Sequence, residues 1–125
     1  MKFRVARHTT DLNRIIDFYT NVVNLQVLGS FSEHAGYNGV FIGLPGCDWH
    51  LEFTTSTEQP DHTPDDDDLL VFYVADQAKQ REIAERCKAM NIQTIPAKNP
   101  YWNQHGLTLS DPDGYKIVIA VVGGF

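Results

Sequence analysis

His50 and Glu52 are the two residues whose types and spacing could most directly do chemistry. They stand two positions apart in the segment from Trp49 to Thr55, and alternate residues of a strand point to the same side of a sheet. An imidazole and a carboxylate held in this way could serve as a general-base pair, or could ligate a metal ion together with His8. A structural carboxylate beside a partly exposed histidine has the same spacing, so the sequence leaves these alternatives open.

Aromatic residues beside a proline form a second candidate site. Tyr101 and Trp102 belong to the segment 99–105, whose proline and amide side chains indicate a loop. Their rings could stack on a flat ligand, or they could pack to close one end of the fold. The sequence favours neither interpretation.

The composition is that of a globular domain with an acidic surface. The chain has 125 residues, of which 42% are hydrophobic and 21% are charged, as in ordinary domains of about 100–150 residues. Its formal net charge of −6 at pH 7 argues against nucleic acid and anionic membranes as partners, because both attract basic surfaces.

The sequence predicts a cytoplasmic protein. No apolar run is as long as a membrane span, and the first residues lack the apolar core of a signal peptide. Cys47 and Cys87 are the only cysteines, whereas small secreted scaffolds carry more of them at framework spacings. We expect two reduced thiols, although the sequence leaves a disulfide between them open.

Sequence patterns predict a strand and a helix at the start of the chain, followed by three strands. Thr10 is a good N-cap, and Asp11 suits the first helical turn. One face of this helix is apolar, through Leu12, Ile15, Ile16, Tyr19 and Val23. The predicted strands of this half cover residues 3–8, 25–32, 38–44 and 49–55.

The same order of elements returns after a linker. Residues 56–68 are almost without apolar side chains, and the adjacent carboxylates of Asp65–Asp68 should repel one another and keep the linker extended. Asp76 can cap a second helix, and residues 111–114 suit a tight turn between two strands. The extended segments of this half are 69–74, a short piece near 92–95, 106–110 and 115–122.

The two halves therefore share one plan. Asp11 and Asp76 each open a helix, and Gly39 matches Gly106 at a similar separation along the chain. Repetition of a strand, a helix and three strands indicates an internal duplication.

Two motifs in this duplicated chain resemble the vicinal oxygen chelate superfamily of glyoxalases, bleomycin-resistance proteins and extradiol dioxygenases. They are Asp-Leu-Asn-Arg-Ile-Ile-Asp-Phe-Tyr at 11–19 and Asp-Pro-Asp-Gly-Tyr-Lys-Ile-Val-Ile at 111–119. The resemblance covers essentially the full chain. It implies an α+β fold in which tandem βαβββ modules form a curled mixed sheet with helices on the convex face. It also implies a single domain, 1–125, made of module one (1–55), a linker (56–68) and module two (69–125).

The resemblance further implies where a metal ion would bind. Metal-dependent members take one ligand from the first strand and one from the last strand of each module. The matching positions here are Arg4, Glu52, Leu69 and Val118. Only Glu52 has lone pairs to offer, and the guanidinium of Arg4 has only donors. We hypothesise that an Arg4–Glu52 ion pair takes the place of the metal, so that the protein needs no metal or other cofactor. If this pair is buried, loss of one partner should cost about 3–5 kcal/mol.

Strand parity predicts a cleft with one polar and one apolar side. Module one contributes polar side chains to the ligand-side face, and module two contributes an apolar wall. Such a cleft suits a small amphipathic or aromatic organic ligand. The predicted ligand-binding residues are Arg4, His50, Glu52, Tyr73, Tyr101 and Trp102.

The resemblance leaves two functions open, because this fold hosts many activities. The first is a protein similar to the bleomycin-resistance proteins, which binds a small organic molecule without metal. The alternative is a metal-dependent isomerase, lyase or dioxygenase in which Glu52 is catalytic and His50 or His8 helps to rebuild the metal site. Whether the protein is an enzyme stays open. Members of the superfamily often dimerise, so we expect a homodimer.

Overall fold

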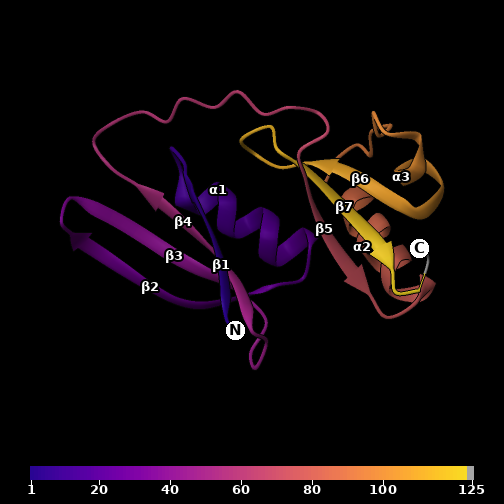
Figure 1. Ribbon diagram of the computed structural model, residues 1–125, viewed down its shortest axis with the longest axis horizontal. Helices are drawn as coiled ribbons and strands as arrows, with labels where there is room; N and C mark the ends of the chain where they lie inside the picture. The colour runs from indigo at the N-terminus through magenta and orange to yellow at the C-terminus, as the bar shows by residue number, and fades with distance from the viewer. Residues whose placement is uncertain (124–125) are drawn as a thin grey trace. The chain divides into compact units, whose positions relative to one another are not determined.

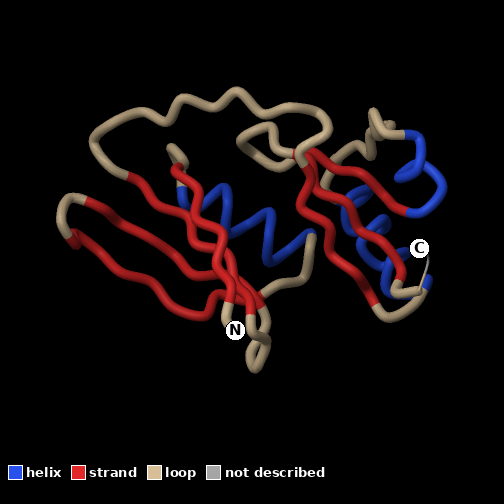
Figure 2. Tube along the Cα trace, in the orientation of Figure 1, coloured by secondary structure: helices blue, strands red, loops and turns tan. Residues whose placement is uncertain are grey.

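The computed structural model describes residues 1–123, which form two compact units with one sheet each (Figure 1). The first unit is Met1–His62, and the second begins at Thr63. The boundary falls inside the predicted linker 56–68, which belongs to the long tan loop of Figure 2. Residues 124 and 125, the end of the predicted module two, lie outside the described residues. That the two units make one domain stays a prediction.

The first unit contains a four-stranded mixed sheet. Its strands are β1 (Phe3–His8), β2 (Gln26–His34), β3 (Tyr37–Gly43) and β4 (Trp49–Thr55). Their order in the sheet is β1-β4-β3-β2, in which β1 runs parallel to β4 and the other pairs are antiparallel. All four strands were predicted to within two residues at each end.

The helix of this unit is capped by Asp11, whose carboxylate accepts hydrogen bonds from the backbone N–H groups of Asn13 (3.0 Å) and Arg14 (3.3 Å). The prediction that Thr10 is the N-cap was wrong by one residue. Asp11 keeps an extended backbone (φ −147°), and its carboxylate faces the positive end of the helix. The helix α1 (Leu12–Asp17) continues directly into a π-helical turn, η1 (Phe18–Val22).

The core of the first unit lies between this helix and the two central strands. Phe18, Tyr19 and Val22 of the π-helical turn are all buried, and the ring of Tyr19 lies 5.1 Å from that of Phe53. The strand residues buried beneath the helix are Val40, Ile42, Leu51 and Phe53. Leu51 and Phe53 therefore lie on the helix side, as strand parity predicted, and Glu52 between them points to the opposite face.

The second unit contains a three-stranded mixed sheet and a long helix. Its strands are β5 (Leu69–Val74), β6 (Gly106–Ser110) and β7 (Lys116–Val121), in the order β5-β7-β6. The helix α2 (Gln77–Ala89) packs on β5 and β7 and begins with the predicted cap, because Asp76 accepts a hydrogen bond from the backbone of Lys79 (2.9 Å). The piece predicted near 92–95 is an isolated bridge between Ile95 and Thr108. The second unit therefore has two strands after its helix, not the predicted three. The two mixed sheets with their helices confirm the predicted α+β fold class.

The segment 99–105 is not the predicted loop but a short helix, α3 (Pro100–His105). The side chain of Asn99 caps it by accepting a hydrogen bond from the backbone of Tyr101 (3.1 Å). Pro100 occupies the first turn, where a missing N–H and a fixed φ cost the helix nothing. The proline that indicated a loop therefore starts a helix.

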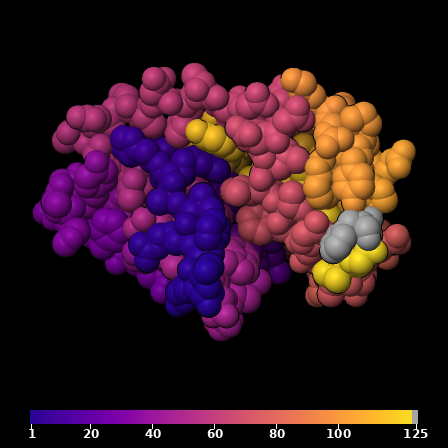
Figure 3. All heavy atoms as spheres, in the orientation of Figure 1, coloured from indigo at the N-terminus to yellow at the C-terminus, as the bar shows by residue number. Residues whose placement is uncertain are grey.

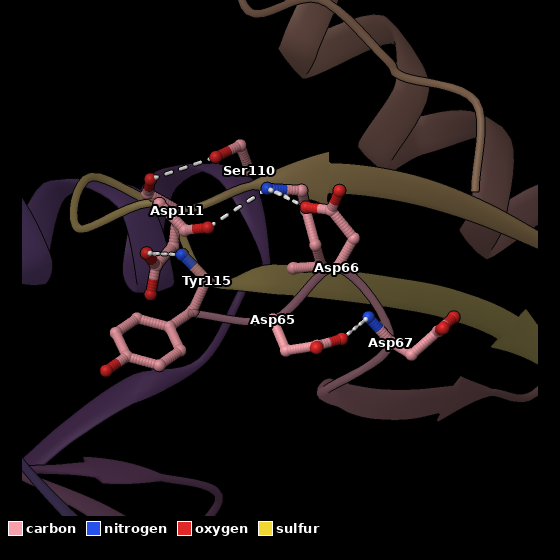
Figure 4. A network of polar contacts seen from close by, with 8 residues as sticks. Asp65, Asp66, Asp67, Ser110, Asp111 and Tyr115 are labelled. Atoms are coloured by element: carbon pink, nitrogen blue, oxygen red, sulfur yellow. Dashed lines mark hydrogen bonds and ion pairs between the residues drawn. The ribbon is translucent and has the colours of Figure 1, made fainter. Parts of the chain in front are cut away.

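Two turns meet near the start of β7 (Figure 4). In the linker, Asp65 accepts a hydrogen bond from the backbone of Asp67 (2.8 Å), so the acidic run forms a turn instead of the predicted extended chain. In the turn at 111–114, the buried side chain of Asp111 accepts hydrogen bonds from the backbones of Asp113 (2.9 Å) and Tyr115 (3.0 Å). Gly114 adopts φ +91°, as the predicted tight turn requires.

The predicted reduced thiols are confirmed, because Cys47 and Cys87 are both free. Cys47 is exposed and Cys87 is buried. Among the helices of the described residues, none has the length and apolar character to cross a membrane.

Candidate functional site

The parallel pairing of β1 with β4 brings three predicted site residues together. Arg4 is the register partner of His50, and Ala6 is the partner of Glu52. The Nε–H group of Arg4 donates a hydrogen bond to Nε2 of His50 (2.9 Å). The Nη1 atom of Arg4 lies 3.7 Å from Oε1 of Glu52. The hypothesised ion pair is therefore present in the first unit.

The two partners of this ion pair differ in exposure. The side chain of Glu52 is 15% exposed, whereas that of Arg4 is 49% exposed. Arg4 belongs to an edge strand, and the indigo atoms of the N-terminal residues form part of the surface in Figure 3. The loss of about 3–5 kcal/mol that we expected for a buried pair therefore does not apply to Arg4 and Glu52. Exposed ion pairs contribute only about 0–1 kcal/mol to stability.

Glu52 has unused hydrogen-bonding capacity. A carboxylate offers about four lone-pair sites, but no residue in the described range donates a hydrogen bond to Glu52, and Arg4 stands at the longer distance of an ion pair. His50, in contrast, uses Nε2 to accept from Arg4, which leaves Nδ1 as the protonated nitrogen of its neutral ring. The oxygens of Glu52 are not among the buried polar atoms without a partner, so solvent reaches them. A ligand that donates a hydrogen bond could replace that water at Glu52.

Aromatic rings support the guanidinium of Arg4 from one side. Its Cζ atom lies 5.0 Å from the centre of the Phe41 ring, a cation–π contact. The ring of Phe31 is 5.7 Å from that of Phe41 and lies over Gly39, where a Cβ atom would come within 2.3 Å of it. Gly39 therefore lets the two rings reach this face of the sheet. Strand parity could have identified Phe41, which is the register partner of Glu52.

His8 does not join this cluster. Its Nε2 atom lies 3.0 Å from the hydroxyl of Ser56, and its ring lies 6.4 Å from that of Tyr37. Both contacts lie at the C-terminal end of β1, whereas Arg4 is near the N-terminal end of that strand. His8 thus interacts with the start of the linker, not with Glu52.

In the second unit, Trp102 lines a cavity of about 430 Å³, whereas Tyr73 and Tyr101 do not. Tyr73 is 47% exposed on β5. Tyr101 is 38% exposed on α3, where its ring packs against those of Trp102 (4.9 Å) and His105 (4.4 Å). Sequence reasoning missed Thr108, which also lines this cavity. The sequence could have indicated Thr108, because this threonine stands between two leucines at the middle of β6. Alternation along the strand turns its side chain to the face opposite the helix.

The residues at the four positions of the expected metal site do not fit a metal ion. Arg4, Leu69 and Val118 offer no lone pair, whatever the arrangement of the two units, and Glu52 alone cannot hold a divalent cation. Within residues 1–123 there is no group of three or more His, Cys, Asp or Glu side chains that could hold a metal. In addition, the guanidinium of Arg4 already places a positive charge beside the lone pairs of His50 and Glu52.

Comparison with protein families gives two successive matches. The YycE-like N-terminal domain family matches residues 3–54, and the YycE-like C-terminal domain family matches residues 67–120. The YycE protein of Bacillus subtilis (strain 168) is 43% identical over 120 residues, which are 94% of this chain and 85% of that protein.

Solved structures agree with this relationship. The crystal structure of Bacillus subtilis YycE, a protein of unknown function, matches with a TM-score of 0.86 and 42% identity over 95% of this chain and 88% of the other. Two more distant structures share the fold. The Leishmania major glyoxalase I matches with a TM-score of 0.73 and 22% identity, covering 94% and 84% of the two chains. TnmS3, an antibiotic binding protein of Streptomyces sp. CB03234, matches with a TM-score of 0.69 and 18% identity, covering 97% and 94%.

Proposed function

Because the chain belongs to the YycE-like family of the vicinal oxygen chelate superfamily, we propose that it binds a small organic molecule without a divalent metal. The state of Glu52 carries this proposal. Its carboxylate is largely buried, is charge-compensated by Arg4 and receives no hydrogen bond from the described residues. A ligand that donates a hydrogen bond to Glu52 would satisfy it.

The surroundings of Glu52 suggest an amphipathic ligand. Arg4 and His50 supply polar groups on one side, and Phe41 supplies an aromatic ring beneath the guanidinium. We propose that the ligand places an N–H or O–H group against Glu52 and an apolar part against Phe41. The antibiotic-binding relative TnmS3 makes drug-like compounds a sensible starting set for a search.

A thermal-shift screen tests the binding proposal. Compounds that bind the folded protein raise its melting temperature in a concentration-dependent way. Hits should lose affinity about tenfold to a hundredfold in Glu52→Gln, because one charge-assisted hydrogen bond contributes roughly 1.5–3 kcal/mol. Glu58→Gln is the matched control, since Glu58 is an exposed glutamate of the same unit. Hits that bind Glu52→Gln as well as they bind the unchanged protein would contradict the role of Glu52.

A metal measurement tests the second half of the proposal. Protein purified without chelator should contain far less than one zinc, iron, manganese or nickel ion per chain. Arg4→His is the informative variant, because it exchanges the guanidinium for an imidazole beside His50 and Glu52 and could then admit a metal. A near-stoichiometric metal in the unchanged protein would overturn the metal-free proposal.

The enzymatic alternative uses the same residue. An unsatisfied, largely buried carboxylate could act as a general base on the bound molecule. Once a ligand is known, conversion of that ligand by the unchanged protein but not by correctly folded Glu52→Gln would favour an isomerase or lyase. Binding without conversion would favour sequestration.

We also propose that the protein is a cytoplasmic homodimer. Exposed apolar side chains on the outer strands of the first unit are consistent with a partner: Phe3 is 60% exposed on β1, and Val27 is 47% exposed on β2. Light scattering should give twice the mass of one chain at micromolar concentration. A monomeric mass would remove the dimer from the proposal and leave the binding site in place.

A further inference from the structure

A β-bulge interrupts β2, the edge strand of the first unit (Figure 1). Val27 pairs with Ile42, but the next pair is Gly29 with Phe41, so Leu28 is an extra residue of this strand. Residues of a regular strand alternate between the two faces of a sheet. An extra residue changes this alternation and re-aims the side chains that follow it.

The bulge brings Leu28 and Phe31 to one face of the sheet. In a regular strand, two residues that are three positions apart point to opposite faces. Here Phe31 is the register partner of Gly39, and its ring lies over that glycine. The Cδ1 atom of Leu28 lies 3.2 Å from a Cβ atom built on Gly43, which is the register partner of His50. Both side chains therefore lie on the face that carries His50, opposite the helix.

Glycines of β3 make room for these two side chains. On this face β3 presents Gly39, Phe41 and Gly43, because alternate residues share a face. Phe31 covers the first glycine and Leu28 the second, and the ring of Phe41 stands between them, 5.7 Å from that of Phe31. Leu28, Phe41 and Phe31 thus form one row, which we call the apolar shelf.

The apolar shelf borders the polar residues of the proposed site. Phe41 is the register partner of Glu52. A Cβ atom on Gly43, beneath Leu28, would come 3.2 Å from Cβ of His50. A ligand that donates a hydrogen bond to Glu52 therefore has apolar side chains beside it in the direction of β2.

The exposure and the length of the shelf indicate what it can bind. Leu28 is 43% exposed, and Phe31 and Phe41 are half-buried, so a ligand that covers them removes apolar surface from water. The two glycines that mark the ends of the shelf are four residues apart on β3, which is about 13 Å along a strand. This is longer than a single aromatic ring.

We propose that the apolar shelf binds an elongated apolar body of the ligand, at least two rings long, and that Leu28 determines this preference for length. The inference rests on the proposed function, in which the same ligand donates a hydrogen bond to Glu52. It adds the shape of the ligand and a specificity-determining residue that strand alternation alone would not place beside Phe31.

Three phenols of increasing length test the proposal: phenol, 2-naphthol and 4-phenylphenol. All three offer the same hydroxyl donor to Glu52 and differ in the apolar body. Dissociation constants are measured from backbone amide shifts in a two-dimensional NMR spectrum. We expect 4-phenylphenol to bind at least about tenfold more tightly than phenol, with 2-naphthol between them, because the second ring covers more of the shelf.

Leu28→Ala is the decisive variant, and Val27→Ala is its matched control. The two residues are neighbours of similar exposure, 43% and 47%, but Val27 pairs with the fully buried Ile42 of the helix side. Leu28→Ala should weaken 4-phenylphenol about tenfold and phenol less than about twofold, because only the longer body reaches Leu28. Val27→Ala should change neither affinity, and Leu28→Met should retain the preference for length.

Three results of these titrations would overturn the proposal. They are an unchanged affinity of Leu28→Ala for 4-phenylphenol, an equal loss for phenol and 4-phenylphenol, and an equal loss in Val27→Ala. Urea unfolding midpoints show that the compared variants are folded, which we expect because neither side chain belongs to the buried core.

Glu52→Gln separates this inference from the proposed function. It should weaken all three phenols by a similar factor, because they share the hydroxyl. A loss in Glu52→Gln without any effect of Leu28→Ala would reject the shelf and leave the proposed function standing. A loss in Leu28→Ala without any effect of Glu52→Gln would keep the shelf and contradict the role of Glu52. The absence of saturable binding by all three phenols would reject the inference, whereas the proposed function is tested by its own thermal-shift screen.

Discussion

The two units each carry an ion pair at similar distance, but with opposite burial. In the first unit the acid is the buried partner, since Glu52 is 15% exposed and Arg4 is 49% exposed at 3.7 Å. In the second unit the base is the buried partner, since Lys116 is 21% exposed and Asp66 is 62% exposed at 3.6 Å. Each pair thus joins one exposed and one partly buried side chain.

The difference lies in what else the buried partner can reach. Lys116 donates a second interaction to the carbonyl of Gly114, so its charge is satisfied within its own turn. Glu52 receives no hydrogen bond from any residue of the described part of the chain. The same pair chemistry therefore stabilises a turn in one unit and leaves an acceptor open to a ligand in the other. A buried group becomes a candidate for function when the local fold fails to satisfy it.

Cysteine labelling should show the largest contrast between the units. Cys47 of the first unit is exposed, whereas Cys87 is buried in α2 of the second unit, where burial raises the pKa of its thiol. Only the thiolate reacts, so we expect Cys47 to react at least about a hundredfold faster with a thiol reagent, since opening of a helix core costs several kcal/mol. Labelling of the Cys47→Ala and Cys87→Ala variants measures each rate separately. Equal rates would show that α2 opens as easily as the Cys47 loop.

The same thiol makes stability depend on pH in a defined direction. Because the folded-state pKa is raised, the unfolded chain ionises first, and the free energy of unfolding should begin to fall as pH rises above about 8.5. For one ionisable group, the free energy of unfolding can change by at most about 1.4 kcal/mol per pH unit. Urea unfolding between neutral and alkaline pH measures it, and Cys87→Ala should remove this contribution.

Two glycine substitutions compare the rigidity of the units. Gly106→Ala places a Cβ atom 2.5 Å from a methyl group of fully buried Val118, so overpacking should cost about 1–3 kcal/mol. Gly39→Ala creates a clash at 2.3 Å with Phe31, but that half-buried ring can turn away at a cost of about 0.5–1.5 kcal/mol. Gly29→Ala is the control, because its Cβ atom would make an ordinary contact at 3.5 Å with Phe41. A larger loss for Gly39→Ala than for Gly106→Ala in urea unfolding would reverse the comparison.

The smallest effects should come from the ion pairs themselves. Arg4→Ala removes the nearest cation from Glu52 and should cost about 1 kcal/mol at low salt, because the guanidinium is half exposed. Asp66→Ala should cost less than about 0.5 kcal/mol, because Lys116 keeps its bond to the Gly114 carbonyl. Both losses are measured by urea unfolding and should shrink at high salt. A loss in the free energy of unfolding as large for Asp66→Ala as for Arg4→Ala would contradict the smaller contribution expected from the Asp66–Lys116 pair.

Much of the fold could be predicted because its signals are local. Alternation placed Leu51 and Phe53 on the helix side and His50 and Glu52 opposite, and the structure has this arrangement. Helix α2 begins at the predicted Asp76 cap. The segment 99–105 was predicted wrongly because a proline indicates a turn and a helix start equally well.

The sequence by itself determined the fold class, the cap of α2 and the donor chemistry of each side chain, since composition, periodicity and side-chain chemistry belong to each residue wherever it lies. Only the tertiary structure decided which polar groups are left unsatisfied. The parallel register of β1 and β4 joins Arg4 to His50 and leaves Glu52 without a donor. The packing around β6 buries the hydroxyl of Thr108 beside a cavity. Burial and hydrogen-bond partners depend on residues far apart in the chain, so no local pattern contains them.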